Sequence, residues 1–145
     1  MQATSSPAQP AERVALGRLW WAGPLVIAAA IAATTVIRLV AVAVLQPDPA
    51  FMPLTPMNPI VLTFVGVLAA VIVFAVVARF ARRPITAFKR IALIALIVSL
   101  VPDLLMLATG FNPGTTLANV LVLMLMHVVA WAISVYGLFA LTRSS

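Results

Sequence analysis

Three ionisable side chains fall within otherwise apolar stretches of the sequence: Arg38, Asp103 and His127. An ionisable group in hydrocarbon is costly, so it usually faces a partner or a water-filled cavity. A carboxylate beside a guanidinium or an imidazole can form a charge-assisted hydrogen bond, and an imidazole can also exchange a proton near neutral pH. We therefore treat Arg38, Asp103 and His127 as one intramembrane polar cluster.

Each member of this cluster has polar groups near it on its own helix. Residues three or four apart share a helix face, and His127 recurs on one stripe with a serine seven positions later. A proline next to Asp103 has no N–H and leaves the carbonyl four residues earlier free as an acceptor. The supporting residues on this basis are Thr34, Thr35, Ser99, Pro102 and Ser134.

Depth in the membrane suggests how the cluster is paired. With a rise of about 1.5 Å per residue, Arg38 and Asp103 each lie roughly 10 Å below the same membrane surface, and His127 lies nearer the middle. An Arg38–Asp103 ion pair that fixes which helices pack together is one expectation. A proton, ion or small-ligand site is the second. The third is that Arg38 extends its guanidinium to the headgroups without a protein partner.

The residue inventory argues against several kinds of site. The chain has one histidine and no cysteine, which cannot fill the usual ligand set of a zinc or haem site. We expect no metal, no cofactor and no catalytic residues. Ser99 and Ser134 are the nearest candidate nucleophiles, but nothing marks either as activated.

Composition identifies a membrane protein. Of the 145 residues, 64% are hydrophobic and 8% are charged, whereas soluble domains carry roughly 25% charged residues. The net charge of +6 would suggest nucleic acid in a soluble protein, but here the cations flank apolar runs, so we expect no nucleic-acid partner. The abundance of Arg, Ala and Val fits a GC-rich bacterial genome.

The apolar runs predict an all-α fold, an integral membrane four-helix bundle. The expected spans are residues 19–45, 60–78, 91–109 and 117–141, within a single membrane domain of residues 15–143. Residues 1–14 read as a disordered cytoplasmic tail. A cleaved signal peptide is the alternative reading of the first run, which is longer than the 7–15 apolar residues of such peptides.

Prolines mark the connections between spans. Five prolines between positions 46 and 59 exclude regular helix. The apolar Phe51, Met52, Leu54 and Met57 favour a loop that folds back over the bundle, although a stiff loop lying among the headgroups is equally compatible. Pro84 is expected to interrupt the helix within a basic loop.

The distribution of positive charge predicts orientation. Eight of the nine cations lie in the N-terminal tail, the loop after the second span and the C-terminus, so both termini are expected in the cytoplasm, in a plasma (cell) membrane. Anionic headgroups and the lipid bilayer are the expected partners, besides a possible homodimer or an unknown membrane protein. The residues expected to meet headgroups are Arg13, Arg18, Arg79, Arg82, Arg83, Lys89 and Arg90.

Three segments carry a family resemblance: the basic loop 81–84, the stretch 99–103 with Pro102 and Asp103, and the apolar stretch 123–130 around His127. Together they resemble a family of uncharacterised small bacterial four-span integral membrane proteins, over about residues 15–142. The resemblance implies a four-helix bundle with a recurrent arginine, aspartate and histidine in its spans, here Arg38, Asp103 and His127, with Pro102. It implies no activity.

Two functions follow from the cluster, and an enzyme acting on a lipid or a quinone is kept as a third alternative. One is a structural or interaction subunit in which the polar residues hold the bundle together. The other is a small proton- or ion-linked transporter, in which Asp103 and His127 line an outward-facing pocket and Arg38 provides the counter-charge.

Overall fold

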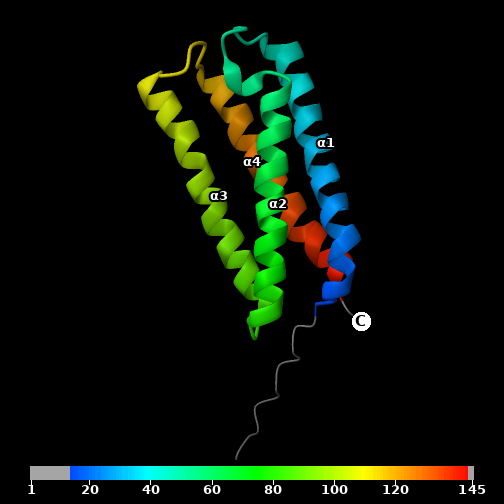
Figure 1. Cartoon of the computed structure of the whole chain (residues 1–145). Coiled ribbons are helices and arrows are strands. Elements are labelled where there is room, and N and C mark those ends of the chain that lie inside the picture. The colour runs from blue at the N-terminus through cyan, green and yellow to red at the C-terminus, as the bar shows by residue number, and fades with distance from the viewer. Residues whose placement is uncertain (1–13, 144–145) are drawn as a thin grey trace, which may run out of the picture.

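The computed structural model describes residues 14–143, and in that part of the chain four long helices form an antiparallel bundle (Figure 1). The four helices are α1 (Leu19–Leu45), α2 (Met57–Phe80), α3 (Pro84–Thr109) and α4 (Leu117–Thr142). Two single 3₁₀ turns, η1 (Leu16–Arg18) and η2 (Met52–Leu54), precede α1 and α2. The expected tail of residues 1–14, with Arg13, lies outside the described residues except for Val14.

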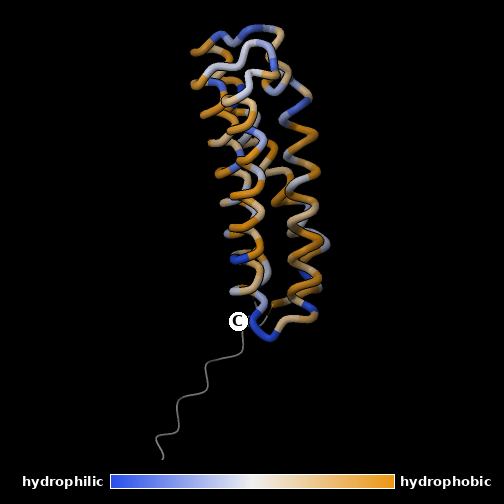
Figure 2. Tube along the Cα trace, turned by 90° about the vertical axis from the view of Figure 1, so that its left-hand side faces the viewer, coloured by the Kyte–Doolittle hydropathy of each residue, from blue (hydrophilic) through white to orange (hydrophobic). Residues whose placement is uncertain are grey.

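Each of the four helices is long and apolar enough to cross a membrane. They contain 24 to 27 residues, which at about 1.5 Å per residue exceeds the ~30 Å hydrocarbon core. Figure 2 shows hydrophobic colour along the helix shafts and hydrophilic colour mainly near the ends of the bundle. The prediction of an all-α membrane protein with four spans is therefore confirmed.

Both ends of the described chain meet at one end of the bundle. The N–H of Ala15 donates to the carbonyl of Thr142 at 2.9 Å, and a guanidinium N–H of Arg18 donates to the carbonyl of Arg143 at 3.0 Å. The short α2–α3 connection lies at this same end, which we call the terminal end (Figure 1). The 46–56 and 110–116 loops form the opposite end, the loop end.

Local chemistry explains where the helices stop. Gly110 follows α3 with a φ of +63°, the left-handed conformation in which glycine commonly ends a helix. Thr116 caps α4 by accepting a hydrogen bond from the N–H of Asn119 at 3.2 Å. Pro84 begins α3 instead of interrupting a helix, because the first helical position needs no N–H from it. Helix α3 therefore starts seven residues before the expected span 91–109.

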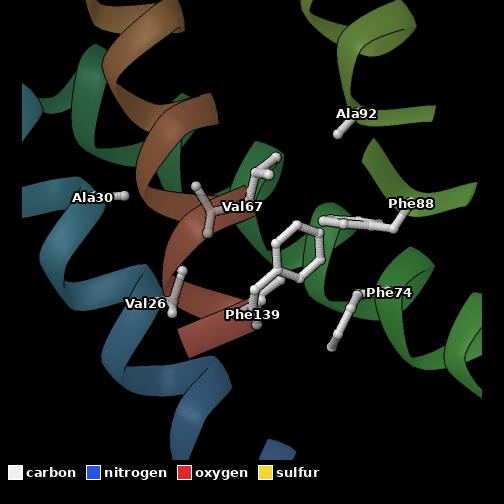
Figure 3. Close-up of a cluster of buried hydrophobic side chains, with 9 residues drawn as sticks. Val26, Ala30, Val67, Phe74, Phe88, Ala92 and Phe139 are labelled. Carbon is white, nitrogen blue, oxygen red and sulfur yellow. The ribbon is translucent and has the colours of Figure 1, made fainter. Parts of the chain in front are cut away.

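The larger of two clusters of buried hydrophobic side chains in the described chain includes three phenylalanines toward the terminal end. Phe74, Phe88 and Phe139, from three different helices, form an aromatic cluster with ring centroids 4.9 to 6.0 Å apart (Figure 3). Two of the three pairs are edge-on and the Phe74–Phe139 pair is tilted, and aromatic pairs of this kind contribute about 0.5–1.5 kcal/mol each. Burial in lipid provides little net drive for helix association, so close packing of this kind and hydrogen bonds across helices must hold the bundle.

Gly137 permits the close approach of α1 and α4. A Cβ added at Gly137 would lie 3.0 Å from Val26 Cγ2. We expect Gly137→Leu to lower the free energy of unfolding in mixed micelles by about 2 kcal/mol, since overpacked cores typically lose that much. Gly66→Ala is the control, because a Cβ there meets nothing within 4 Å. A Gly137→Leu protein as stable as this control would show that α1 and α4 do not pack as described.

Candidate functional site

Asp103 and His127 face each other across the α3–α4 contact. His127 Nδ1 lies 3.2 Å from Asp103 Oδ2, and the Asp103 side chain is 7% exposed against 39% for His127. It is the single contact within 4.0 Å between a carboxylate and a basic side chain among residues 14–143. The deeply buried partner is therefore the acid, and the histidine lies between it and the outside of the bundle.

The contacts of His127 Nδ1 define the state of the ring. This atom lies 2.9 Å from the carbonyl oxygen of Leu123 as well as 3.2 Å from Asp103 Oδ2. Two oxygen acceptors around one nitrogen favour a proton on Nδ1. One N–H cannot point at both, and in the described chain Oδ2 of Asp103 lacks a hydrogen bond of good geometry. The Asp103 contact is thus mainly electrostatic, and Nε2 is the ring atom left to meet another molecule.

Arg38 does not join Asp103, contrary to the expected pair. Its Nε donates to the carbonyl oxygen of Leu54 at 2.8 Å, and Leu54 lies in the 46–56 loop. The physical reason is local competition, since the loop brings an unpaired backbone carbonyl to α1 and the imidazole already faces the carboxylate. Arg38 therefore connects the loop to α1, and the structure shows one carboxylate–imidazole contact and one loop contact in place of an Arg38–Asp103 pair.

The five supporting residues differ in whether their side chains make a polar contact with another helix. Thr34 Oγ1 lies 3.2 Å from Thr63 Oγ1 and joins α1 to α2. Ser99 and Ser134 donate to carbonyls of their own helices, Leu96 and Ala130 respectively, at 2.7 Å. Thr35 has no such side-chain bond within residues 14–143, and Pro102 is exposed within α3. Of these five, Thr34 alone makes a polar contact between helices.

The 46–56 loop covers the loop end of the bundle. Phe51 and Leu54 are buried and pack with Met106, Leu123 and Met126 of α3 and α4. This is the folded-back arrangement that the apolar residues favoured. Met52 and Met57 differ from that expectation, because they are 58% and 64% exposed. Phe51 and Leu54 thus cover the bundle, whereas Met52 of the loop and Met57, the first residue of α2, are exposed.

A groove lies between α2 and α3, and residues of α4 form its base. Its volume is about 250 Å³, and its lining is mostly apolar. His127, Trp131 and Ser134 line it from α4, and Ser99 lines it from α3. Figure 1 shows α3 leaning away from α2 toward the loop end. His127 thus contacts the buried carboxylate of Asp103 through Nδ1 and also lines the groove.

Sequence reasoning missed two polar features of this region. Thr63, the partner of Thr34, was detectable as an isolated threonine in an apolar span. The second is the indole N–H of Trp131, which is buried and has no hydrogen-bond partner among the described residues. Trp131 lies on the same stripe as His127, but an unpaired donor has no signature in a sequence.

The cations gather away from this site. Arg18, Arg79, Arg82, Arg83 and Arg143 lie in or beside the elements that meet at the terminal end. Lys89 places its ammonium 5.3 Å from the centroid of the Phe139 ring, within the range of a cation–π contact. Within residues 14–143, no three His, Asp or Glu side chains gather to hold a metal ion, and we assign no metal site.

Comparisons with known proteins agree with the sequence resemblance. No curated protein and no solved structure matches the chain. The model of a family of unknown function, DUF6069, matches residues 14–144. Because that match spans nearly all of the sequence, the chain belongs to the DUF6069 family of unknown function.

Proposed function

We propose that this membrane protein is a structural or interaction subunit whose polar side chains fix the arrangement of its own helices. The observation that carries the proposal is the Asp103–His127 pair, because the buried carboxylate is met by a side chain of the neighbouring helix. A buried pair of this type can specify which helices pack together while contributing little net stability.

The other polar contacts support the same role. Thr34 meets Thr63 between α1 and α2, and Arg38 holds the loop that covers the loop end. Each contact joins two parts of the bundle. Charged groups on a transport path would instead be expected along a water-filled cavity.

Proton flux into liposomes tests this proposal. Purified protein is reconstituted with a pH-sensitive dye inside, and a potassium diffusion potential drives protons inward. A structural role predicts the same flux as in protein-free liposomes, for the parent and for Asp103→Asn alike. Flux in the parent that disappears in Asp103→Asn at equal incorporation would overturn the proposal and support a carrier.

A small carrier is the second candidate, and one observation favours it. His127 contacts both the buried Asp103 and a groove large enough for a small molecule. An imidazole that links a buried acid to a cavity could relay a proton to a bound substrate. The liposome experiment separates this candidate from the structural one.

We also propose that the terminal end faces the cytoplasm of a plasma membrane. The cation-rich end carries Arg82 and Arg83 on the α2–α3 connection, whereas the loop end carries Asp48 and no Lys or Arg. The positive-inside rule then orients the bundle, and the arginines meet anionic headgroups. Because the chain lacks cysteine, single cysteines at either end, labelled with a membrane-impermeant maleimide in intact cells, read the orientation directly.

A further inference from the structure

The groove between α2 and α3 exists because small residues line it on every side. Gly66 and Ala70 line it from α2, Ala92 and Ala95 from α3, and Ala130 from α4. A Cβ added at Gly66 would meet nothing within 4 Å. The space of about 250 Å³ between the helices is left unfilled by the described side chains, so it has room for an occupant.

The groove opens sideways, toward the surroundings of the helices. Leu62 and Gly66 of α2 and Ala95 of α3 line it and are exposed. These residues lie within apolar helices that are long enough to span a membrane, so the surroundings at this depth are lipid. At the loop end, buried Phe51 and Leu54 cover the bundle. An occupant therefore enters from the bilayer and must be lipophilic.

Two groups on one face of α4 set the polar chemistry of this occupant. The indole N–H of Trp131 is buried and has no acceptor among residues 14–143, and a buried donor without a partner costs about 1–3 kcal/mol. His127, one helical turn earlier, has its Nδ1 occupied by Leu123 and Asp103. Both residues line the groove. The indole nitrogen has almost no accessible surface, so a ligand oxygen reaches it only once the ring turns toward the groove. Accepting from Trp131 would then remove the cost of the unpaired donor.

Charge and size narrow the ligand class. The carboxylate of Asp103, behind His127, disfavours an anionic ligand, and the groove lining contains no acidic side chain to hold a cation. The volume falls just below the ~300–1,000 Å³ of typical drug-sized pockets, so a ring with a short tail fits better than a two-chain lipid. The lining also includes the aromatic rings of Phe88 and Trp131.

We propose that this groove is a binding site for an uncharged lipophilic carbonyl compound of the quinone type, with Trp131 Nε1 donating to a carbonyl oxygen. The proposal concerns binding alone and holds whether the Asp103–His127 pair is structural or moves protons.

Quenching of Trp131 fluorescence in lipid nanodiscs tests the proposal. Trp20→Phe and Trp21→Phe leave Trp131 as the single tryptophan, and decylubiquinone is the probe. We expect saturable quenching whose midpoint shifts at least tenfold in Gly66→Leu, since a leucine there fills the groove. Ala69→Leu is the matched control, because Ala69 is exposed on the same helix and does not line the groove, and its midpoint should stay unchanged.

Three results would overturn the proposal. The first is quenching that rises linearly with the probe, as expected from partitioning into lipid alone. The second is a midpoint that Gly66→Leu leaves unchanged, with circular dichroism showing an intact fold. The third is equally tight competition by decanoate, because a carboxylate would then satisfy the site as well as a neutral carbonyl. If Gly66→Leu does not fold, Ala95→Leu on the opposite wall replaces it with the same expected shift.

Discussion

His127→Leu is expected to lower the free energy of unfolding by about 2 kcal/mol, while Asp103→Leu changes it by less than about 1 kcal/mol. Oδ2 of Asp103 already lacks a hydrogen bond among the described residues, so the imidazole is the electrostatic partner of the buried carboxylate. Removing the imidazole leaves that carboxylate without this partner, and a buried polar group that loses its partner costs about 1–3 kcal/mol. Removing the acid leaves His127 Nδ1 with the Leu123 carbonyl at 2.9 Å. Leucine branches at the same atom as aspartate and is somewhat larger, so Asp103→Leu opens no cavity.

The double variant completes this argument. With both residues replaced by leucine, no polar side chain of this pair remains, so most of the loss in His127→Leu should be recovered. Unfolding of the four proteins by sodium dodecyl sulfate in mixed micelles gives the coupling free energy of the pair. Asp103→Leu as costly as His127→Leu would contradict the asymmetry and mean that the pair provides net stability. Ser99→Ala, which removes a hydroxyl bonded within its own helix, is the neutral control.

Hydropathy predicted the helices well because a membrane leaves few alternatives. Every backbone polar group within hydrocarbon must be satisfied internally, which forces each long apolar run into a helix. Helix α1 begins and ends at the expected residues, 19 and 45. Helix α3 begins earlier than predicted. The prediction placed Lys89 and Arg90 in a loop because they are charged, but both cations also fit at the water-facing start of a helix.

The pairing of polar residues could not be predicted from depth alone. Arg38 and Asp103 lie at similar depth, but depth does not reveal which helix faces compete for a partner. The group that binds Arg38 is the backbone carbonyl of Leu54 in a proline-rich loop. Every residue has such a carbonyl, so the sequence cannot show which one is available as a partner. The Asp103–His127 contact depends in the same way on the rotation of α3 against α4. The groove depends on small residues of three helices meeting at one level, and alanine is too common in this chain to indicate that.

Gly114→Ala is expected to lower stability by about 3 kcal/mol and to release the 46–56 loop from the bundle. Gly114 has a φ of +73°, a conformation that costs an L-residue about 1–2 kcal/mol. An added Cβ would also lie 2.7 Å from Asp48 Cβ and 3.2 Å from Phe51 Cβ. Asp48 cannot easily retreat, because its side chain accepts from the N–H of Ala50 and its carbonyl accepts from the N–H of Phe51, both at 2.8 Å.

Gly110→Ala separates the cost of the left-handed backbone conformation from the cost of the steric contact with Asp48 and Phe51. Gly110 has a similar φ of +63°, but a Cβ there meets nothing within 4 Å. Its substitution should therefore cost about 1 kcal/mol and leave the loop in place. Hydrogen exchange measured by mass spectrometry distinguishes the variants: amides of residues 48–55 should lose protection in Gly114→Ala and keep it in Gly110→Ala. Equal protection in both would mean that contact between the two loops does not hold Phe51 and Leu54 over the bundle, which would leave that task to Arg38.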